Sequence, residues 1–176
     1  YFDKLIYTLP LPFLARLAPS MPADVRAACE GLRYQGIYCI NLGVDRENIS
    51  DKHWIYFYED GFPFHRLSLP ANFSPDTVPP GKSSIATEVA FSRERPLNKD
   101  AAVSQTIQAL RTAGLIRSDD TIELIHTETV YPAYVIYDHH HRQNVDVIRS
   151  WLDEHGIVPA GRFGEWQYFN MDHSLG

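Results

Sequence analysis

Cysteine is scarce in this sequence, and so are the patterns that mark several common functions. Only Cys29 and Cys39 occur among the 176 residues, too few for a disulfide framework or a cysteine metal site. Acidic residues outnumber basic ones by 22 to 16 and no basic tract is present, so we expect no nucleic-acid partner. No apolar run approaches the roughly 18 residues of a membrane span, and signal-peptide features are absent. These absences favour a reduced, cytoplasmic compartment.

Motifs for phosphate binding and nucleophilic catalysis are also missing. The sequence has neither a Walker A motif nor the Gly-x-Gly-x-x-Gly fingerprint of dinucleotide-binding folds. Ser174 lies in no Gly-x-Ser-x-Gly elbow. Residues 138–141, Asp-His-His-His, form a histidine cluster, but adjacent histidines do not readily converge on one ion. We therefore favour Asp138 as a cap of the next helix over a metal site.

The residues that are present indicate a globular chain with one compact domain. Hydrophobic residues make up 44% and charged residues 22%, which excludes a disordered protein. Hydrophobic periodicity predicts an α+β fold, in which an antiparallel or mixed β-sheet has helices packed on one face. The predicted strands cover residues 2–9, 33–44, 53–58, 64–69, 84–92, 121–125, 134–137 and 157–160, and the predicted helices cover residues 12–17, 22–32, 98–113 and 142–155. Asp60-Gly61 predicts a hairpin between two of these strands, and Asn98 is a predicted N-cap. Pro132 predicts that the strand after it lies at an edge or is irregular.

The most informative stretch is the last one, Gly-Arg-Phe-Gly-Glu-Trp-Gln-Tyr-Phe-Asn-Met-Asp at 161–172. Glycine lets a backbone approach a ligand closely. The polar residues at the end of the stretch predict the first turn of a helix, and a helix N-terminus suits anions. Arg162 adds a forked cation, and Trp166 and Tyr168 add flat rings with a polar edge. These parts suit a phosphate-bearing ligand with a ring. The alternative is a glycine-rich surface loop with its aromatic residues in the core.

This stretch resembles the flavin-contacting segment of FAD-dependent oxidoreductases of the amine oxidase and protoporphyrinogen oxidase superfamily. It is most similar to the branch that contains UDP-galactopyranose mutase, whose segment reads Gly-Arg-Leu-Gly-x-Tyr-x-Tyr-x-Asp-Met. Trp166 stands in place of the first tyrosine and Asn170 in place of the aspartate, departures that count against mutase activity. The resemblance implies that FAD is the cofactor, and it also implies which residues bind FAD and which bind the substrate. The implied cofactor-binding residues are Gly161, Arg162, Gly164, Met171 and Asp172, and Trp166 and Tyr168 are implied to bind substrate.

Two earlier stretches carry the same resemblance more weakly. Phe-Pro-Phe-His-Arg at 62–66 is similar to the Val-Pro-Tyr-Thr-Arg run of the mutases, which implies that Arg66 faces the substrate cleft. Its alternative is an ordinary surface arginine. Tyr-Pro-Ala-Tyr at 131–134 is similar to their Tyr-Tyr-Pro-Val-Asn run, which implies a substrate contact for Tyr134, with Tyr137 as a rival.

The resemblance implies that residues 1–156 form a substrate-binding domain. Residues 157–176 would return the chain toward an FAD-binding domain that lies outside this sequence. We therefore expect a fragment that is inactive alone, binds a small molecule and presents one sheet face to the flavin. The first alternative is a flavin-dependent isomerase acting on a UDP-sugar. The second is a non-enzymatic module that binds a small ligand.

Overall fold

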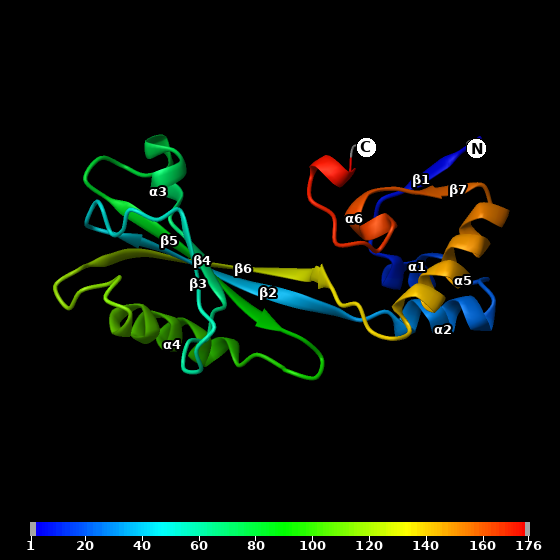
Figure 1. Cartoon of the computed structure of the whole chain (residues 1–176), viewed down its shortest axis with the longest axis horizontal. Coiled ribbons are helices and arrows are strands. Elements are labelled where there is room, and N and C mark those ends of the chain that lie inside the picture. The colour runs from blue at the N-terminus through cyan, green and yellow to red at the C-terminus, as the bar shows by residue number, and fades with distance from the viewer. Residues whose placement is uncertain (1–2, 175–176) are drawn as a thin grey trace. The chain divides into compact units, whose positions relative to one another are not determined.

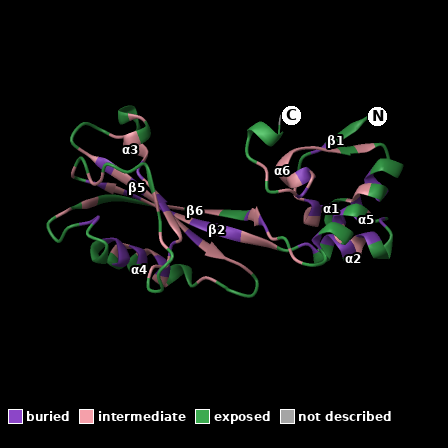
Figure 2. Cartoon of the chain, viewed as in Figure 1, coloured by how far each residue is buried: buried purple, intermediate pink, exposed green. Residues whose placement is uncertain are grey.

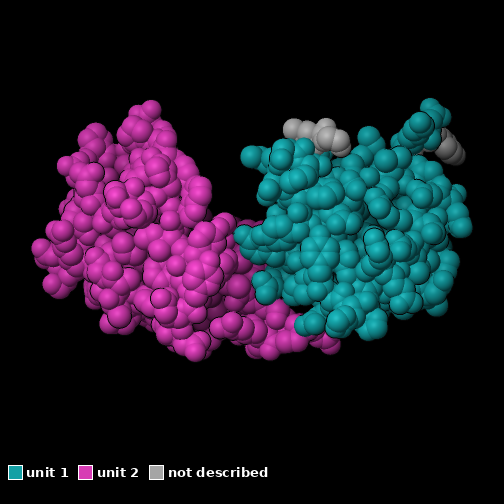
Figure 3. Space-filling model, viewed as in Figure 1, with its two compact units in different colours: residues 1–35, 132–176 teal, residues 36–131 magenta. Residues whose placement is uncertain are grey.

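The structure is a computed structural model that describes residues 3–174 (Figure 1). The chain divides into two compact units, so the prediction of one compact domain is wrong (Figure 3). Unit 1 comprises residues 1–35 and 132–176, and unit 2 comprises residues 36–131. The chain passes from unit 1 to unit 2 within β2 (Tyr34–Val44) and returns within β6 (Ile122–Val135). The sequence also predicted that the substrate-binding domain ends at residue 156 and that residues 157–176 return the chain to an FAD-binding domain. This functional boundary stays a prediction.

Unit 2 is built on a five-stranded sheet with the order β3-β4-β5-β2-β6. β3 (Trp54–Tyr56), β4 (Arg66–Ser68) and β5 (Ser83–Phe91) follow one another as antiparallel neighbours, and β5 pairs antiparallel with β2. The hairpin that the sequence predicted around Gly61 is present, with φ of +103° at that glycine. The predicted α+β class is confirmed by this sheet and by the helices that accompany it.

One face of this sheet packs against α4 (Lys99–Thr112). Alternate residues of β2 and β5 are buried there, as the period of a strand requires (Figure 2). Asn98 caps the helix, because its side-chain oxygen accepts hydrogen bonds from the N–H groups of Asp100 and Ala101 at 3.1 and 3.3 Å. α3 (Pro70–Phe73) and the 3₁₀ turn η1 (Pro75–Thr77) connect β4 to β5.

Pro132 does not divide the strand that contains it. The sequence predicted separate strands at 121–125 and 134–137, whereas β6 is continuous from Ile122 to Val135. β6 lies at the edge of the sheet, so the missing N–H of a proline need not interrupt a hydrogen-bonded pair. The expectation that this segment lies at an edge is confirmed.

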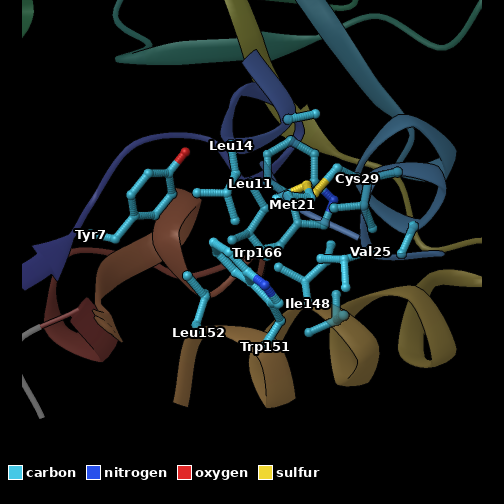
Figure 4. Close-up of a cluster of buried hydrophobic side chains, with 14 of the residues drawn as sticks. Tyr7, Leu11, Leu14, Met21, Val25, Cys29, Ile148, Trp151, Leu152 and Trp166 are labelled. Atoms are coloured by element: carbon cyan, nitrogen blue, oxygen red, sulfur yellow. The ribbon is translucent and has the colours of Figure 1, made fainter. Parts of the chain in front are cut away.

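Unit 1 has a two-stranded parallel sheet and three longer helices. β1 (Leu5–Tyr7) pairs with β7 (Ile157–Pro159), and Ile6 lies opposite Val158. α1 (Leu11–Leu17), α2 (Ala23–Gly31) and α5 (His141–Glu154) enclose the core. None of the described helices is long and apolar enough to cross a membrane. Figure 4 shows the core side chains, of which the wholly buried ones are Leu11, Cys29, Ile148, Leu152 and Trp166.

The segment after β7 is more regular than the glycine-rich loop that the sequence offered as an alternative. α6 (Gly161–Gly164) is a single helical turn, and Asp172–Ser174 form a 3₁₀ turn, η2, where the sequence predicted the start of a helix. Gly164 is buried against β1, and a Cβ atom there would lie 2.3 Å from the carbonyl oxygen of Tyr7. Close packing with β1 therefore explains this glycine without a ligand.

Candidate functional site

Arg162 is the centre of the candidate site, and the single turn of α6 positions it. Its Nη1 donates to the carbonyl oxygen of Phe169 at 3.3 Å, and its Nη2 donates to that of Ala133 at 3.2 Å. These two carbonyls hold the guanidinium plane between the end of β6 and the segment that follows α6. Because carbonyl oxygens carry no full charge, they orient the cation without neutralising it.

Two tyrosine rings complete the surroundings of the guanidinium. Its central carbon lies 5.0 Å from the ring centroid of Tyr134 and 4.4 Å from that of Tyr168, which is the range of cation–π contacts. The two rings stack on each other with centroids 5.7 Å apart and planes at 14°. The structure therefore brings together three of the residues that the sequence assigned to the cofactor or the substrate: Arg162, Tyr134 and Tyr168.

Part of the hydrogen-bonding capacity of Arg162 is unused. Its Nε is buried and has no hydrogen-bond partner, and within residues 3–174 no carboxylate pairs with this arginine. Arg162 also lines an open pocket of about 690 Å³ together with residues 169–172 and Ser174. An unneutralised cation flanked by rings at a pocket suits an anionic ligand that carries a flat ring.

Trp166 lies in the core rather than in the cleft that the sequence suggested. Its side chain is 0% exposed and lies among the core residues of unit 1 (Figure 4). It packs edge-on against Tyr34, with ring centroids 5.8 Å apart. The indole N–H has no hydrogen-bond partner. Its backbone φ is +56°, a left-handed conformation that non-glycine residues rarely adopt. Trp166 thus anchors the segment that carries Tyr168, and it does not line the pocket.

The remaining predicted cofactor residues flank Arg162 in different ways. Gly161 opens α6 with φ of +72°, which favours glycine, and Gly164 packs on β1 as described above. Met171 is 86% exposed and lines the pocket beside Asp172. Asp172 is also largely exposed and lies 3.5 Å from Nδ1 of His173. The roles of these four residues in cofactor binding stay predictions.

Arg66 belongs to unit 2 and has a different environment. It lies on the sheet face opposite α4, because its neighbour Leu67 points into the core. Its guanidinium pairs with the carboxylate of Glu88, and the Nε–Oε1 distance is 3.1 Å. Arg66 and Glu88 are direct cross-strand partners in the β4–β5 register. Sequence reasoning missed Glu88, although its place in the alternating pattern of residues 84–92 was a usable signal.

Neither cysteine is set up as a nucleophile. Both are free, and burial raises the pKa of the Cys29 thiol to about 11. Burial also raises the pKa of Cys39, and the nearby carboxylates of Glu88 and Glu128 raise it further. A raised pKa keeps a thiol protonated and unreactive near neutral pH.

The histidine cluster leads into α5, whose N-cap is His140 and has no side-chain cap, so the prediction that Asp138 caps this helix is wrong. The N–H of His140 donates to Oδ1 of Asp138 at 3.0 Å, and Nε2 of His141 lies 3.0 Å from the carbonyl oxygen of Trp166. The side chains of residues 138, 139 and 141 line a polar pocket of about 500 Å³. Among residues 3–174 no three histidine, cysteine or carboxylate side chains are grouped to hold a metal ion.

Comparison with solved structures gives clear matches, although no family model matches the sequence. A reduced UDP-galactopyranose mutase matches 99% of this chain with a TM-score of 0.92 and 26% sequence identity. A protein described as a protoporphyrinogen oxidase from Exiguobacterium matches 92% with a TM-score of 0.70 and 12% identity. An oxidoreductase from Methanosarcina mazei matches 72% with a TM-score of 0.57 and 17% identity.

The matched chains are much longer than this one. The chain spans 39% of the mutase, 36% of the Exiguobacterium protein and 31% of the Methanosarcina protein. The two matches of lower identity establish the fold alone, whereas the mutase match extends over almost every residue. The resemblance to the amine oxidase and protoporphyrinogen oxidase superfamily, including its mutase-like branch, is thereby confirmed.

Proposed function

We propose that this chain is the substrate-binding part of an FAD-dependent oxidoreductase of the superfamily that it resembles. The observation that carries the proposal is the environment of Arg162, a cation with a buried, unpartnered Nε, two tyrosine rings and no carboxylate partner in the described residues. Such a group fits the phosphates or ring of a dinucleotide, or an anionic substrate beside it. We place the protein in the cytoplasm, in keeping with its two unpaired cysteines.

FAD would supply the redox chemistry when bound, and this chain would orient the reactants around it. Arg162 would hold the cofactor, and Tyr134 and Tyr168 would contact the substrate. Most of the FAD would be held by a separate domain of the same polypeptide. Residues 157–176 would return the chain to that domain.

The exposed face of the small parallel sheet supports this arrangement. Ile6 and Val158 lie opposite each other in β1 and β7 and are 66% and 50% exposed. Parallel sheets are normally covered on both faces, so we expect another part of the protein to cover this exposed apolar face. An FAD-binding domain built around a parallel sheet would cover it.

The visible absorption spectrum of the purified polypeptide that carries this sequence tests the proposal. A flavin spectrum, either as purified or after incubation with FAD and removal of the excess, is the expected result. In the Arg162→Gln variant, we expect the same protein to retain less flavin after dialysis. A protein that stays colourless after incubation with FAD would contradict the proposal and leave a non-enzymatic module that binds a small ligand.

A flavin-dependent isomerase that acts on a UDP-sugar is the second candidate. The mutase match supports it, because both its TM-score and its sequence identity exceed those of the Exiguobacterium protein. Trp166 and Asn170 count against it, since they depart from the mutase pattern. Protection from thermal unfolding by millimolar UDP would favour the isomerase. A flavin-containing protein that UDP does not protect would favour the oxidoreductase.

A further inference from the structure

The backbone around Trp166 is held in place by two side chains from another part of the sequence. The left-handed φ of this residue turns the chain sharply between α6 and Tyr168. Within the turn, the N–H of Gln167 donates to the carbonyl oxygen of Arg162 at 2.9 Å. From outside it, Nε2 of His141 lies 3.0 Å from the carbonyl oxygen of Trp166. The buried His141 ring, if protonated on Nε2, donates this hydrogen bond.

Tyr137 holds the next two residues. Its hydroxyl accepts a hydrogen bond from the N–H of Tyr168 at 2.7 Å and donates one to Oε1 of Gln167 at 3.1 Å. The Tyr137 ring also packs edge-on against His141, with centroids 4.4 Å apart. Tyr137 and His141 therefore form one brace, which spans from the end of β6 to the start of α5 and holds three consecutive residues of the turn.

The brace matters because, apart from its ring contacts with Tyr134 and Arg162, Tyr168 has little packing to fix it. Its side chain is 52% exposed, so core packing does not immobilise it, in contrast to the wholly buried Trp166. Yet Tyr168 supplies the nearer of the two rings around Arg162, and the neighbouring Phe169 supplies one of its two carbonyl partners. Displacing residues 168–169 would remove both contacts at once.

We propose that Tyr137 is a positioning residue, whose hydroxyl fixes Tyr168 and thereby orients Arg162 toward its ligand. What Arg162 then binds rests on the function proposed above, whereas the arrangement itself can be tested without any ligand. From the sequence, Tyr137 was only the second candidate, after Tyr134, for a contact with the substrate. The structure gives the two tyrosines different roles, since the Tyr134 ring contacts Arg162 and Tyr137 acts through Tyr168.

Chemical modification of arginine by phenylglyoxal, mapped by peptide mass spectrometry, provides the test. Tyr137→Phe removes both hydrogen bonds of the hydroxyl and keeps the ring on His141. We expect Arg162 to react about fivefold faster in this variant than in the protein that keeps Tyr137. Fivefold is about the change in an equilibrium constant that the loss of one ordinary hydrogen bond causes. The matched control Tyr58→Phe alters a tyrosine that is 89% exposed in unit 2, and it should leave the rate unchanged.

Arg26 serves as the internal reference within unit 1. It also donates to two backbone carbonyls, those of Ala15 at 2.7 Å and Pro19 at 3.1 Å. The proposal expects a faster reaction at Arg162 with no change at Arg26. Equal rates at Arg162 with and without the Tyr137 hydroxyl would overturn it, and so would a parallel rise at Arg26, which would show general loosening of the unit.

A second variant keeps the test decisive if Tyr137→Phe does not fold. Gln167→Met removes the acceptor of the Tyr137 hydroxyl and leaves the bond from the Tyr168 N–H in place. We expect a smaller rise at Arg162 in the same direction, and no rise would count against the brace. Because phenylglyoxal needs no cofactor, failure of the protein to bind FAD would contradict the proposed function and leave this measurement intact.

Discussion

Arg66 and Arg162 carry the same functional group in opposite settings. Arg66 projects from a regular strand and is neutralised by Glu88 on the neighbouring strand. Arg162 projects from a single helical turn and is held by carbonyl oxygens and tyrosine rings. The difference teaches that a cation intended for an anionic ligand needs partners that orient it without cancelling its charge. Arg162 meets this condition. Arg66 could bind an anionic ligand only after its ion pair with Glu88 is broken.

The scaffolds behind the two arginines differ as well. The strand that holds Arg66 is fixed by sheet hydrogen bonds and by Leu67 in the core beneath it. The turn that holds Arg162 depends on one buried indole, one close-packed glycine and the Tyr137–His141 brace. Changes to these few residues should therefore affect Arg162 far more than any comparable change near Arg66.

The largest effect is expected from removing the indole that anchors the turn. Trp166→Ala empties a wholly buried site, and such changes destabilise a protein by about 3–5 kcal/mol. Trp54→Ala, its counterpart in unit 2, truncates a side chain that is 55% exposed and should lower the free energy of unfolding by about 1 kcal/mol or less. Urea denaturation followed by circular dichroism would measure both. Equal losses would show that the two units depend on their tryptophans alike.

A smaller loss is expected from adding one methyl group to α6. In Gly164→Ala the new Cβ would lie 2.3 Å from the carbonyl oxygen of Tyr7, so backbone must move, at a cost of about 1–3 kcal/mol. Gly81→Ala provides the control, because nothing lies within 4 Å of its added Cβ and only the positive φ of +79° opposes it. Thermal unfolding would compare them. A more stable Gly164→Ala protein would exclude the packing explanation for this glycine.

The charges themselves can be compared through ligand binding. Arg162→Gln is expected to weaken binding of FAD by at least about tenfold, because a charge-assisted hydrogen bond is worth about 1.5–3 kcal/mol. Arg66→Gln should weaken it less, by about threefold, because Glu88 already offsets that charge. Isothermal titration calorimetry of the unmodified protein and both variants would give the affinities. A greater loss with Arg66→Gln would reverse the assignment.

Local patterns in the sequence predicted the regular parts of the molecule well. The alternation of residues 34–44 marked a central strand, Asn98 marked the start of α4, and Gly61 marked the hairpin. The irregular part around Arg162 was predicted less well. The left-handed φ of Trp166 and its place in the core depend on α5 and on Tyr34, which are distant in sequence. Propensity does not reveal such contacts.

The candidate site shows the same division. Arg162, Tyr134 and Tyr168 could be selected from short motifs, because the motif itself carries the functional groups. Their supports could not be selected in this way. Glu88 is set opposite Arg66 by the register of two strands, and His141 reaches Trp166 only once α5 has packed. Supporting residues are fixed by tertiary structure, so short motifs do not identify them.

A third arginine sharpens the comparison, because Arg46 combines both kinds of partner. It donates to the Asp120 carboxylate at 2.6 and 2.9 Å and to the carbonyl oxygen of Leu115 at 3.0 Å. The hydrogen bond from Arg46 is the main cause that lowers the pKa of Asp120 to about 2, and the N–H of Arg117 contributes further. Here the carboxylate clearly belongs to a structural pair.

This pair predicts how stability depends on pH. The folded pKa of Asp120, about 2, lies below the value of about 3.9 expected in the unfolded chain. The stabilising contribution is therefore complete above about pH 5 and is lost as the pH falls from there toward 2. Asp120→Asn should cost roughly 1 kcal/mol at pH 7 and very little near pH 2. Urea denaturation of both proteins across this range would measure the difference, and a constant gap would show that the ion pair contributes nothing.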